Sequence, residues 1–309
     1  MKGRVTSQNQ KQAGAPCPVP AYAADGSVLG TVRTIMEVKN ITDFMEDRWS
    51  LPDPGSVPAW CRMRGGQGVR CTVATMAEFA GTPAEAGDAT RSQIAGIRRL
   101  AGIPGAAWAV KPSAIGLLAD PRLFDENLLT LARETGLAGI SLEIDMEGRP
   151  LVDATIRSAL ALTGRGIKVT LAIQAYLDRT TRDLVTCTAA GIPIRLVKGT
   201  YLGDTSDFIA IQERFRRFAA TLIAAEIPFA AATHDPDLIA WLEKELADRH
   251  ELVEFGFLKG LADQTKLRLA AGGWKVAEYV PFGPGGDAYR LRRERYLRML
   301  DQLGREPAP

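Results

Sequence analysis

Short apolar runs alternate with longer amphipathic stretches along the chain from about residue 69 onward. The eight apolar runs have strand character and are Val69–Val73, Ala107–Val110, Ile140–Ile144, Val169–Ile173, Ile194–Val197, Phe229–Ala232, Leu252–Leu258 and Val276–Val280. Stretches of helical length lie between them, among them Leu123–Glu134, Ser206–Ala225, Asp237–Ala247 and Asp287–Leu303. Strand–helix units of roughly 30 residues, repeated eight times, are typical of a (β/α)8 barrel. We therefore predict an α/β fold, with a TIM-like (β/α)8 barrel over residues 69–309.

A doubly wound parallel sheet is the alternative architecture for such alternation. Its phosphate-binding fingerprint, GxGxxG directly after the first strand, is absent from this sequence. The glycine-rich stretch 65–68 precedes a strand, so we expect a turn there. At the helix ends, Asp204 and Ser206 are expected to cap the helix over 206–225, and Gly191 is expected to end the helix before it.

The first 68 residues differ in pattern from the remainder. Residues 1–26 are polar and rich in Gly, Pro, Ala and Gln, which predicts a flexible tail. Between residues 28 and 49 the apolar spacing is typical of one or two helices, so residues 27–68 are predicted to form an N-terminal helical extension of the barrel. Neither segment carries a motif that indicates chemistry.

Composition and charge narrow the function classes. The 309 residues are 46% hydrophobic, which supports one large core. A net charge of +2, from 38 basic and 36 acidic residues, argues against an extended nucleic-acid surface. Four cysteines without CxxC spacing indicate reduced thiols, and two histidines outside any HExxH cluster argue against a metal site. The sequence has neither an apolar run of about 18 residues nor a signal-peptide core, so we expect a cytoplasmic protein.

Six of the eight predicted strands carry polar residues at or near the end where barrel enzymes have their active sites. These residues are Lys111, Asp145, Gln174, Lys198 with Arg195 in the same strand, Thr233 with His234, and Tyr279. Any one of them alone is more often a solvated, paired or core residue. Their convergence on one mouth is what predicts a binding site.

Cations exceed anions in this set, which suits an anionic substrate or a cofactor that carries phosphates. The pair Arg292-Arg293 lies on the last predicted helix. A guanidinium matches a carboxylate in bidentate geometry, which lysine does not reproduce. The alternative for this pair is an ordinary basic helix surface.

Eight short motifs, in order along residues 110–293, resemble those of the FAD-dependent, monofunctional proline dehydrogenase family. They are Val110–Ala114, Ile144–Glu147, Ile173–Tyr176, Arg195–Tyr201, Ala232–Asp235, Glu254–Gly260, Tyr279–Gly283 and Tyr289–Arg293. The resemblance implies a distorted (β/α)8 barrel that binds FAD non-covalently. It implies oxidation of L-proline to 1-pyrroline-5-carboxylate by hydride transfer to FAD. It also implies that the electrons leave to a quinone or another acceptor, with at most transient membrane contact at the inner membrane face.

The resemblance also implies a role for each matching residue. Arg195, Lys111 and Asp145 form the catalytic set, with Arg195 beside the flavin N5. The substrate-binding residues would be Lys111, Leu258, Tyr279, Arg292 and Arg293, with the two arginines and Lys111 on the carboxylate and Asp145 as the partner of Lys111. The cofactor-binding residues would be Gln174, Arg195, Lys198, Gly199, Thr200, Tyr201, Thr233 and His234.

The chain departs from the family pattern at a few positions. Tyr296 stands four residues after Arg292, where the family has a glutamate, and Glu78 belongs to only a loose match of the first strand. A substituted proline or another cyclic imino acid, in a biosynthetic pathway, is therefore the alternative substrate. Two other classes stay open: a barrel aldolase with Lys111 or Lys198 as a Schiff-base lysine, and a barrel that binds a ligand without catalysis.

Overall fold

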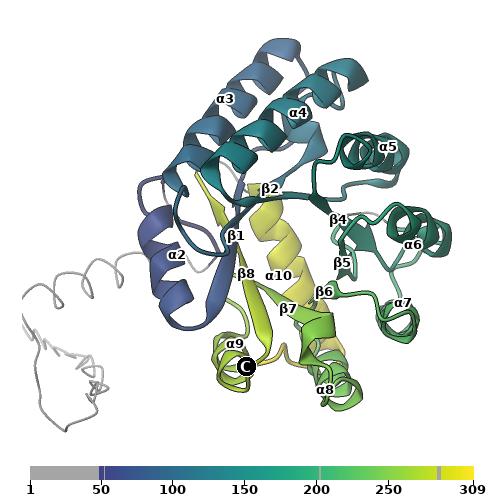
Figure 1. Ribbon diagram of the computed structural model, residues 1–309. Helices are drawn as coiled ribbons and strands as arrows, with labels where there is room; N and C mark the ends of the chain where they lie inside the picture. Colours follow the sequence, from purple (N-terminus) through teal and green to yellow (C-terminus); the bar gives the residue numbers. More distant parts are fainter. Residues whose placement is uncertain (1–48, 52, 202, 284–286) are drawn as a thin grey trace, which may run out of the picture. The chain divides into compact units, whose positions relative to one another are not determined.

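A closed barrel of eight parallel strands forms the centre of the computed structural model (Figure 1). The structure describes residues 49–51, 53–201, 203–283 and 287–309. The strands follow one another around the barrel in chain order, and β8 pairs with β1 to close it. They are β1 Val69–Thr75, β2 Ala107–Val110, β3 Ser141–Ile144, β4 Val169–Gln174, β5 Ile194–Val197, β6 Phe229–Ala232, β7 Val253–Leu258 and β8 Lys275–Phe282. The predicted (β/α)8 barrel is therefore confirmed.

A helix follows each strand. These helices are α3 Pro83–Arg99, α4 Pro121–Ala138, α5 Val152–Thr163, α6 Thr180–Ala189, α7 Phe208–Ala224, α8 Pro236–Glu245, α9 Asp263–Ala271 and α10 Asp287–Gln302, with α2 Val57–Gly66 before β1. In Figure 1, α3 to α9 lie around the outside of the barrel, whereas α10 runs across the middle of the view. None of the helices in the described ranges is long and apolar enough to span a membrane.

Both faces of a parallel barrel sheet are covered, so most positions in the strands are apolar and buried. All four residues of β2 are buried, and Trp108 of this strand is fully covered by α3. Helix α3 begins with a capping box, in which the Thr82 side chain accepts from the Glu85 amide and Glu85 accepts from the Thr82 amide. The capping box therefore determines where α3 begins, and the contact with Trp108 holds this helix against β2.

The predicted cap of α7 is wrong. The helix begins at Phe208, and Asp207 caps it by accepting a hydrogen bond from the Ala210 amide at 2.9 Å. Asp204 instead accepts from the Asp178 amide at 2.8 Å and pairs with Arg149 at 2.7 Å. Two aspartates lie close together in this loop, and the sequence pattern does not distinguish a capping carboxylate from one that braces the loop.

Two glycine predictions have different outcomes. Gly191 follows the end of α6 with φ of +72°, which confirms that a glycine ends this helix. The stretch 65–68 forms a turn only in its second half, because α2 continues to Gly66. Gly68 alone of these takes a positive φ, +76°.

The predicted tail and most of the predicted helical extension lie outside the described residues. Within the extension, α2 is a helix, and its Trp60 and Arg64 contact β8. The chain divides into two units, Met1–Asp43 and Phe44–Pro309, and the barrel belongs to the second. The boundaries at residues 26 and 68 stay predictions.

The packing of α3 on β2 depends on Gly96. A Cβ at this position would lie 2.3 Å from the Cη2 atom of Trp108. We expect Gly96→Ala to lower the free energy of unfolding by about 1–3 kcal/mol, because the clash outweighs the better helix propensity of alanine. Urea unfolding measures the change.

Gly87→Ala is the matched control in the same helix. There the added Cβ meets only the end of the Arg91 side chain, at 3.3 Å. We expect this variant to gain about 0.5–1 kcal/mol of stability from helix propensity. Equal shifts in both variants would contradict the packing argument.

Candidate active site

The structure brings all of the predicted site residues together around one cavity at the carboxyl ends of the strands. The residues that line it include Lys111, Asp145, Gln174, Arg195, Lys198, Gly199, Thr200, Tyr201, Thr233, His234, Leu258, Tyr279, Arg292 and Arg293. They come from the ends of β2 to β8 and from α10. This is the face of the barrel on which such folds place their active sites. Their individual roles stay predictions.

Arg195 of β5, Asp145 after β3 and Tyr279 of β8 form a tight group in this cavity. The Arg195 Nη2 atom lies 2.5 Å from Asp145 Oδ1, and the Tyr279 hydroxyl donates to Asp145 Oδ2 at 2.6 Å. The Arg195 guanidinium also lies 5.6 Å from the centroid of the Tyr279 ring. Burial, reinforced by the nearby Asp145 carboxylate, raises the pKa of Tyr279 well above its ordinary value. Tyr279 therefore stays a hydrogen-bond donor.

A second carboxylate, Glu143 of β3, holds the other side of Arg195. Its Oε2 atom lies 3.3 Å from Arg195 Nη1, and its Oε1 atom accepts from Thr72 at 2.8 Å and from Arg70 at 3.2 Å. Burial opposes the charge of Arg195, but the carboxylates of Glu143 and Asp145 outweigh it and raise the pKa of this guanidinium. Arg195 is thus a buried cation that two carboxylates hold in place.

Arg292 on α10 is also paired, but with a residue that the sequence matched only loosely. Both oxygens of Glu78 accept hydrogen bonds from its guanidinium, one of them at 3.1 Å from Nη1. The Tyr201 ring lies 4.8 Å from the same guanidinium, and its hydroxyl donates to Glu78 at 3.2 Å. The ion pair expected from an acid on α10 is therefore made by an acid from the segment after β1.

Arg293 differs from its neighbour. Its exposed fraction is 8%, yet it makes no ion pair and no hydrogen bond with any described residue, and its Nε atom is buried without a partner. Its guanidinium lies 5.2 Å from the Tyr289 ring, whose hydroxyl is also buried without a partner. Burial raises the pKa of Tyr289 to about 12, so this phenol keeps its proton. A buried cation without an anion is costly, which indicates that a ligand supplies the anion.

Lys111 and Lys198 are both engaged with the protein. The Lys111 amine donates to the Thr75 carbonyl at 2.7 Å, and no ion pair with Asp145 occurs among the described contacts. The Lys198 amine lies 2.6 Å from Asp235 and 4.0 Å from the centroid of the Phe208 ring. Burial lowers the pKa of Lys198, although Asp235 opposes the shift. Neither amine is presented as a free nucleophile, which disfavours a Schiff-base aldolase.

Gln174, Gly199 and His234 form a further part of the cavity wall. The Gln174 side-chain amide donates to the Glu147 carbonyl at 2.8 Å, and its Oε1 atom is buried without a partner. Gly199 has φ of +127°, and a Cβ there would lie 1.2 Å from Tyr176. The His234 ring accepts from the Leu258 amide at 2.9 Å. The wall thus combines an orphan acceptor with a backbone segment that only glycine fits.

Several residues at the cavity were given no role in the sequence analysis. They are Arg70, Thr72, Glu143, Glu254, Tyr289 and Tyr296, which line the cavity, and Glu78 and Glu147, which contact residues that do. Glu143, Asp145 and Glu147 follow at intervals of two. Because side chains alternate across a strand, this spacing was a usable signal for acids on one face. Glu78 carried no such signal, because it follows its strand after two other loop residues.

Comparisons with known proteins identify the family of this chain and solved structures with the same fold. A family model described as proline dehydrogenase matches residues 60–294. Proline dehydrogenase 1 of Bacillus subtilis (strain 168) is 37% identical over 68 residues, which are 21% of this chain and 22% of that protein.

Solved structures share the fold. Proline utilization A from Bdellovibrio bacteriovorus, inactivated by N-propargylglycine, has a TM-score of 0.72 at 19% identity, over 85% of this chain and 33% of that chain. A mutant of proline utilization A from Bradyrhizobium japonicum has a TM-score of 0.68 at 20% identity, over 82% and 31%. The present chain therefore spans only a third or less of the length of these proteins, and the likeness concerns their barrel fold.

The close approach of Gly199 to Tyr176 leads to a stability test. We expect Gly199→Ala to lower the free energy of unfolding by about 3 kcal/mol, because the added methyl group overlaps Tyr176 and the backbone conformation disfavours alanine. Gly191→Ala is the control, since its φ is +72° but nothing lies within 4 Å of the added Cβ. It is expected to lose about 1 kcal/mol. Equal losses in urea unfolding would show that the Tyr176 contact is unimportant.

Proposed function

We propose that this chain, which belongs to the proline dehydrogenase family, oxidises L-proline to 1-pyrroline-5-carboxylate with bound FAD. The observation that carries the proposal is Arg293, a buried guanidinium that lines the cavity and has no partner anion among the described residues. The carboxylate of an amino acid would supply that anion in bidentate geometry. A non-catalytic binding barrel would not need the fixed Arg195–Asp145–Tyr279 group beside it.

The cationic groups around the cavity support a single orientation of such a substrate. Arg292 and Arg293 on α10 would grip the carboxylate, and Lys111 after β2 would approach it with the amine protons that it does not donate to Thr75. Leu258 and Tyr279 would pack on the ring. Oxidation removes a hydride from C5, the ring CH2 beside nitrogen, which FAD would accept, and a proton from nitrogen, which would pass to solvent, so no protein nucleophile is required. Holding the substrate in one orientation makes the transfer effectively unimolecular.

The part of the cavity wall that contains Gln174, Gly199 and His234 fits FAD as the resident cofactor. Gln174 offers a buried acceptor and Arg195 a buried Nε donor, neither of which has a partner in the described part of the chain. The residues that would hold the cofactor are Gln174, Arg195, Lys198, Gly199, Thr200, Tyr201, Thr233 and His234. When bound, FAD supplies a two-electron acceptor. Lys198 is a cation that suits a group carrying phosphates, and Arg195 would lie beside the flavin N5.

Asp145 has an orienting role in this proposal. Both of its oxygens already accept strong hydrogen bonds, one from Arg195 and one from Tyr279. It therefore fixes the direction of these two side chains rather than accepting a proton from the substrate. A quinone or another acceptor would then take the electrons onward, with at most transient contact to a membrane.

A substituted proline or another cyclic imino acid is the second candidate substrate, and Tyr296 is the observation that favours it. Tyr296 lines the cavity at the α10 position where the family has an acid, and its ring lies 6.3 Å from that of His234. An aromatic group here changes the shape and polarity of the wall. A panel of L-proline, trans-4-hydroxy-L-proline and L-pipecolate separates the two candidates.

The first test is a visible absorption spectrum of the purified protein before and after anaerobic addition of L-proline. Flavin bands that bleach with L-proline support the main proposal. Bands that persist with L-proline and bleach with another member of the panel favour the second candidate. Absence of flavin bands, even after FAD is supplied, would overturn both.

Arg293→Lys tests the carboxylate grip. We expect the KM for L-proline to rise roughly 30-fold, about 2 kcal/mol, because lysine lacks the planar fork. The flavin spectrum should be unchanged. Arg295→Lys, an exposed position on the same helix, is the control and should leave KM unaltered. A normal KM in Arg293→Lys would place the carboxylate elsewhere.

A further inference from the structure

Strand β7 extends past the end of its neighbour β6, so Leu258 at the end of β7 has no residue of β6 to pair with. Strand β6 ends at Ala232, whose partner on β7 is Gly256, while β7 continues to Leu258. On that side Thr233 still donates its amide to Gly256 at 3.2 Å, and on the other side Lys259 donates to Tyr279 at 2.9 Å. In a parallel ladder, alternate residues bond to opposite neighbours. The amide and carbonyl of Leu258 therefore face the side where β6 has ended, and they need other partners.

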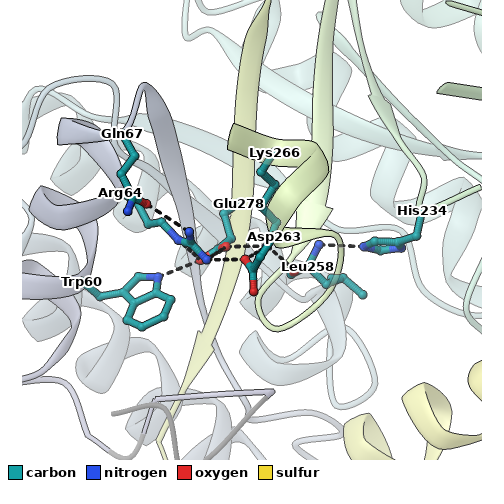
Figure 2. A network of polar contacts seen from close by, with 8 residues as sticks. All are labelled: Trp60, Arg64, Gln67, His234, Leu258, Asp263, Lys266 and Glu278. Atoms are coloured by element: carbon teal, nitrogen blue, oxygen red, sulfur yellow. Dashed lines mark hydrogen bonds and ion pairs between the residues drawn. The ribbon is translucent and has the colours of Figure 1, made fainter. Parts of the chain in front are cut away.

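Two side chains supply these partners (Figure 2). The Leu258 amide donates to Nε2 of His234 at 2.9 Å. The Lys266 amine donates to the Leu258 carbonyl at 3.0 Å. Lys266 lies on α9 and is fully buried. Side chains from two different elements thus complete the sheet around Leu258.

Lys266 is held in place from outside the barrel (Figure 2). Its amine also lies 2.6 Å from Glu278 and 3.0 Å from Asp263, so all three of its protons have acceptors. Glu278 is fully buried and accepts further hydrogen bonds from Trp60 at 2.7 Å and Arg64 at 3.3 Å. The position of the Lys266 amine is therefore set by α2, α9 and β8 together.

The contact with Leu258 also determines the protonation of His234. An Nε2 atom that accepts a hydrogen bond carries no proton, so the neutral ring has its proton on Nδ1. Burial, with the charges of Arg293 and Lys266, lowers the pKa of His234 well below its ordinary value. His234 lines the cavity, and its Nδ1 has no partner among the described residues. The ring consequently keeps one uncommitted donor.

We propose that Lys266 is a positioning residue for the cavity, although it does not line it. It fixes the backbone of Leu258, the Leu258 amide selects the Nδ1–H tautomer of His234, and the Leu258 side chain is kept on the cavity wall. The part that concerns Leu258 and substrate rests on the proposed function. The part that concerns His234 does not, because it depends only on contacts within the protein.

The tautomer is measured directly in the wild-type protein. The chain has two histidines, so a long-range 1H–15N spectrum of the 15N-histidine-labelled full chain contains two ring systems, assigned with His250→Asn. We expect His234 to be neutral and protonated on Nδ1 at neutral pH, without added substrate. A ring protonated on Nε2, or on both nitrogens, overturns the inference without any variant of Lys266.

Lys266→Met and Arg64→Met form a matched pair. Both side chains contact Glu278 and Asp263, but only Lys266 contacts Leu258. Both variants should lower the thermal midpoint. Only Lys266→Met should mix the His234 tautomers and raise the KM for L-proline, roughly tenfold with kcat within about twofold. Lys266→Arg, which keeps a charged donor, should recover part of both effects.

The outcomes separate the two proposals. Identical His234 signals in Lys266→Met and Arg64→Met would reduce the network to a structural role and overturn the inference. A protein that never reduces FAD with L-proline contradicts the proposed function, while the His234 signals still decide the role of Lys266. If Lys266→Met does not fold, the wild-type spectrum carries the test.

Discussion

The cavity depends on the ion pairs that Arg195 makes with two carboxylates, Glu143 in β3 and Asp145 directly after it. Arg195 lies two strands away from Glu143 and Asp145 in the barrel order, and it reaches both, at 3.3 and 2.5 Å. A buried guanidinium without these acids would be strongly destabilising. Because Asp145 also accepts from Tyr279, the same contact aligns β3, β5 and β8 at the mouth.

Strand β8 carries a second buried network on its outer face. Consecutive side chains of a strand point to opposite faces. Tyr279 therefore faces the cavity, whereas Glu278 faces α2 and α9 and binds Trp60, Arg64 and Lys266 (Figure 2). Two adjacent residues thus connect the cavity to helices outside the barrel. This outer network is connected to the cavity wall through Lys266, which donates a hydrogen bond to the Leu258 carbonyl at the end of β7.

The barrel could be predicted from sequence for a physical reason. Parallel strands that are covered on both faces are mostly apolar, so each one stands out as a short run between amphipathic helices. The site could be predicted because the polar residues directly after those runs share one edge. Neither of these two patterns predicts the roles of Glu78 and Lys266. Glu78 is brought to Arg292 by the loop after β1, and Lys266 acts from a helix through a backbone carbonyl.

The contacts of Glu78 with Arg292 and of Lys266 with Leu258 depend on how separate elements pack in the fold, and no local sequence pattern predicts them. The cap of α7 illustrates the same limit at short range, since Asp204 and Asp207 have the same chemistry and only the loop geometry assigns the cap to Asp207. Propensity rules identify which residue types can cap a helix. They do not decide between two that are close in sequence.

The cations that line the cavity fall into two groups, those with a carboxylate partner among the described residues and those without one. Of the described cationic side chains that line the cavity, Arg70, Arg195, Lys198 and Arg292 each have a carboxylate partner. Lys111 and Arg293 have none, and they belong to different elements, the end of β2 and α10. A buried positive charge is tolerated when an anion arrives to meet it. An anionic ligand in this cavity would meet that requirement, and the same cavity is lined by the apolar side chain of Leu258 and the ring of Tyr279.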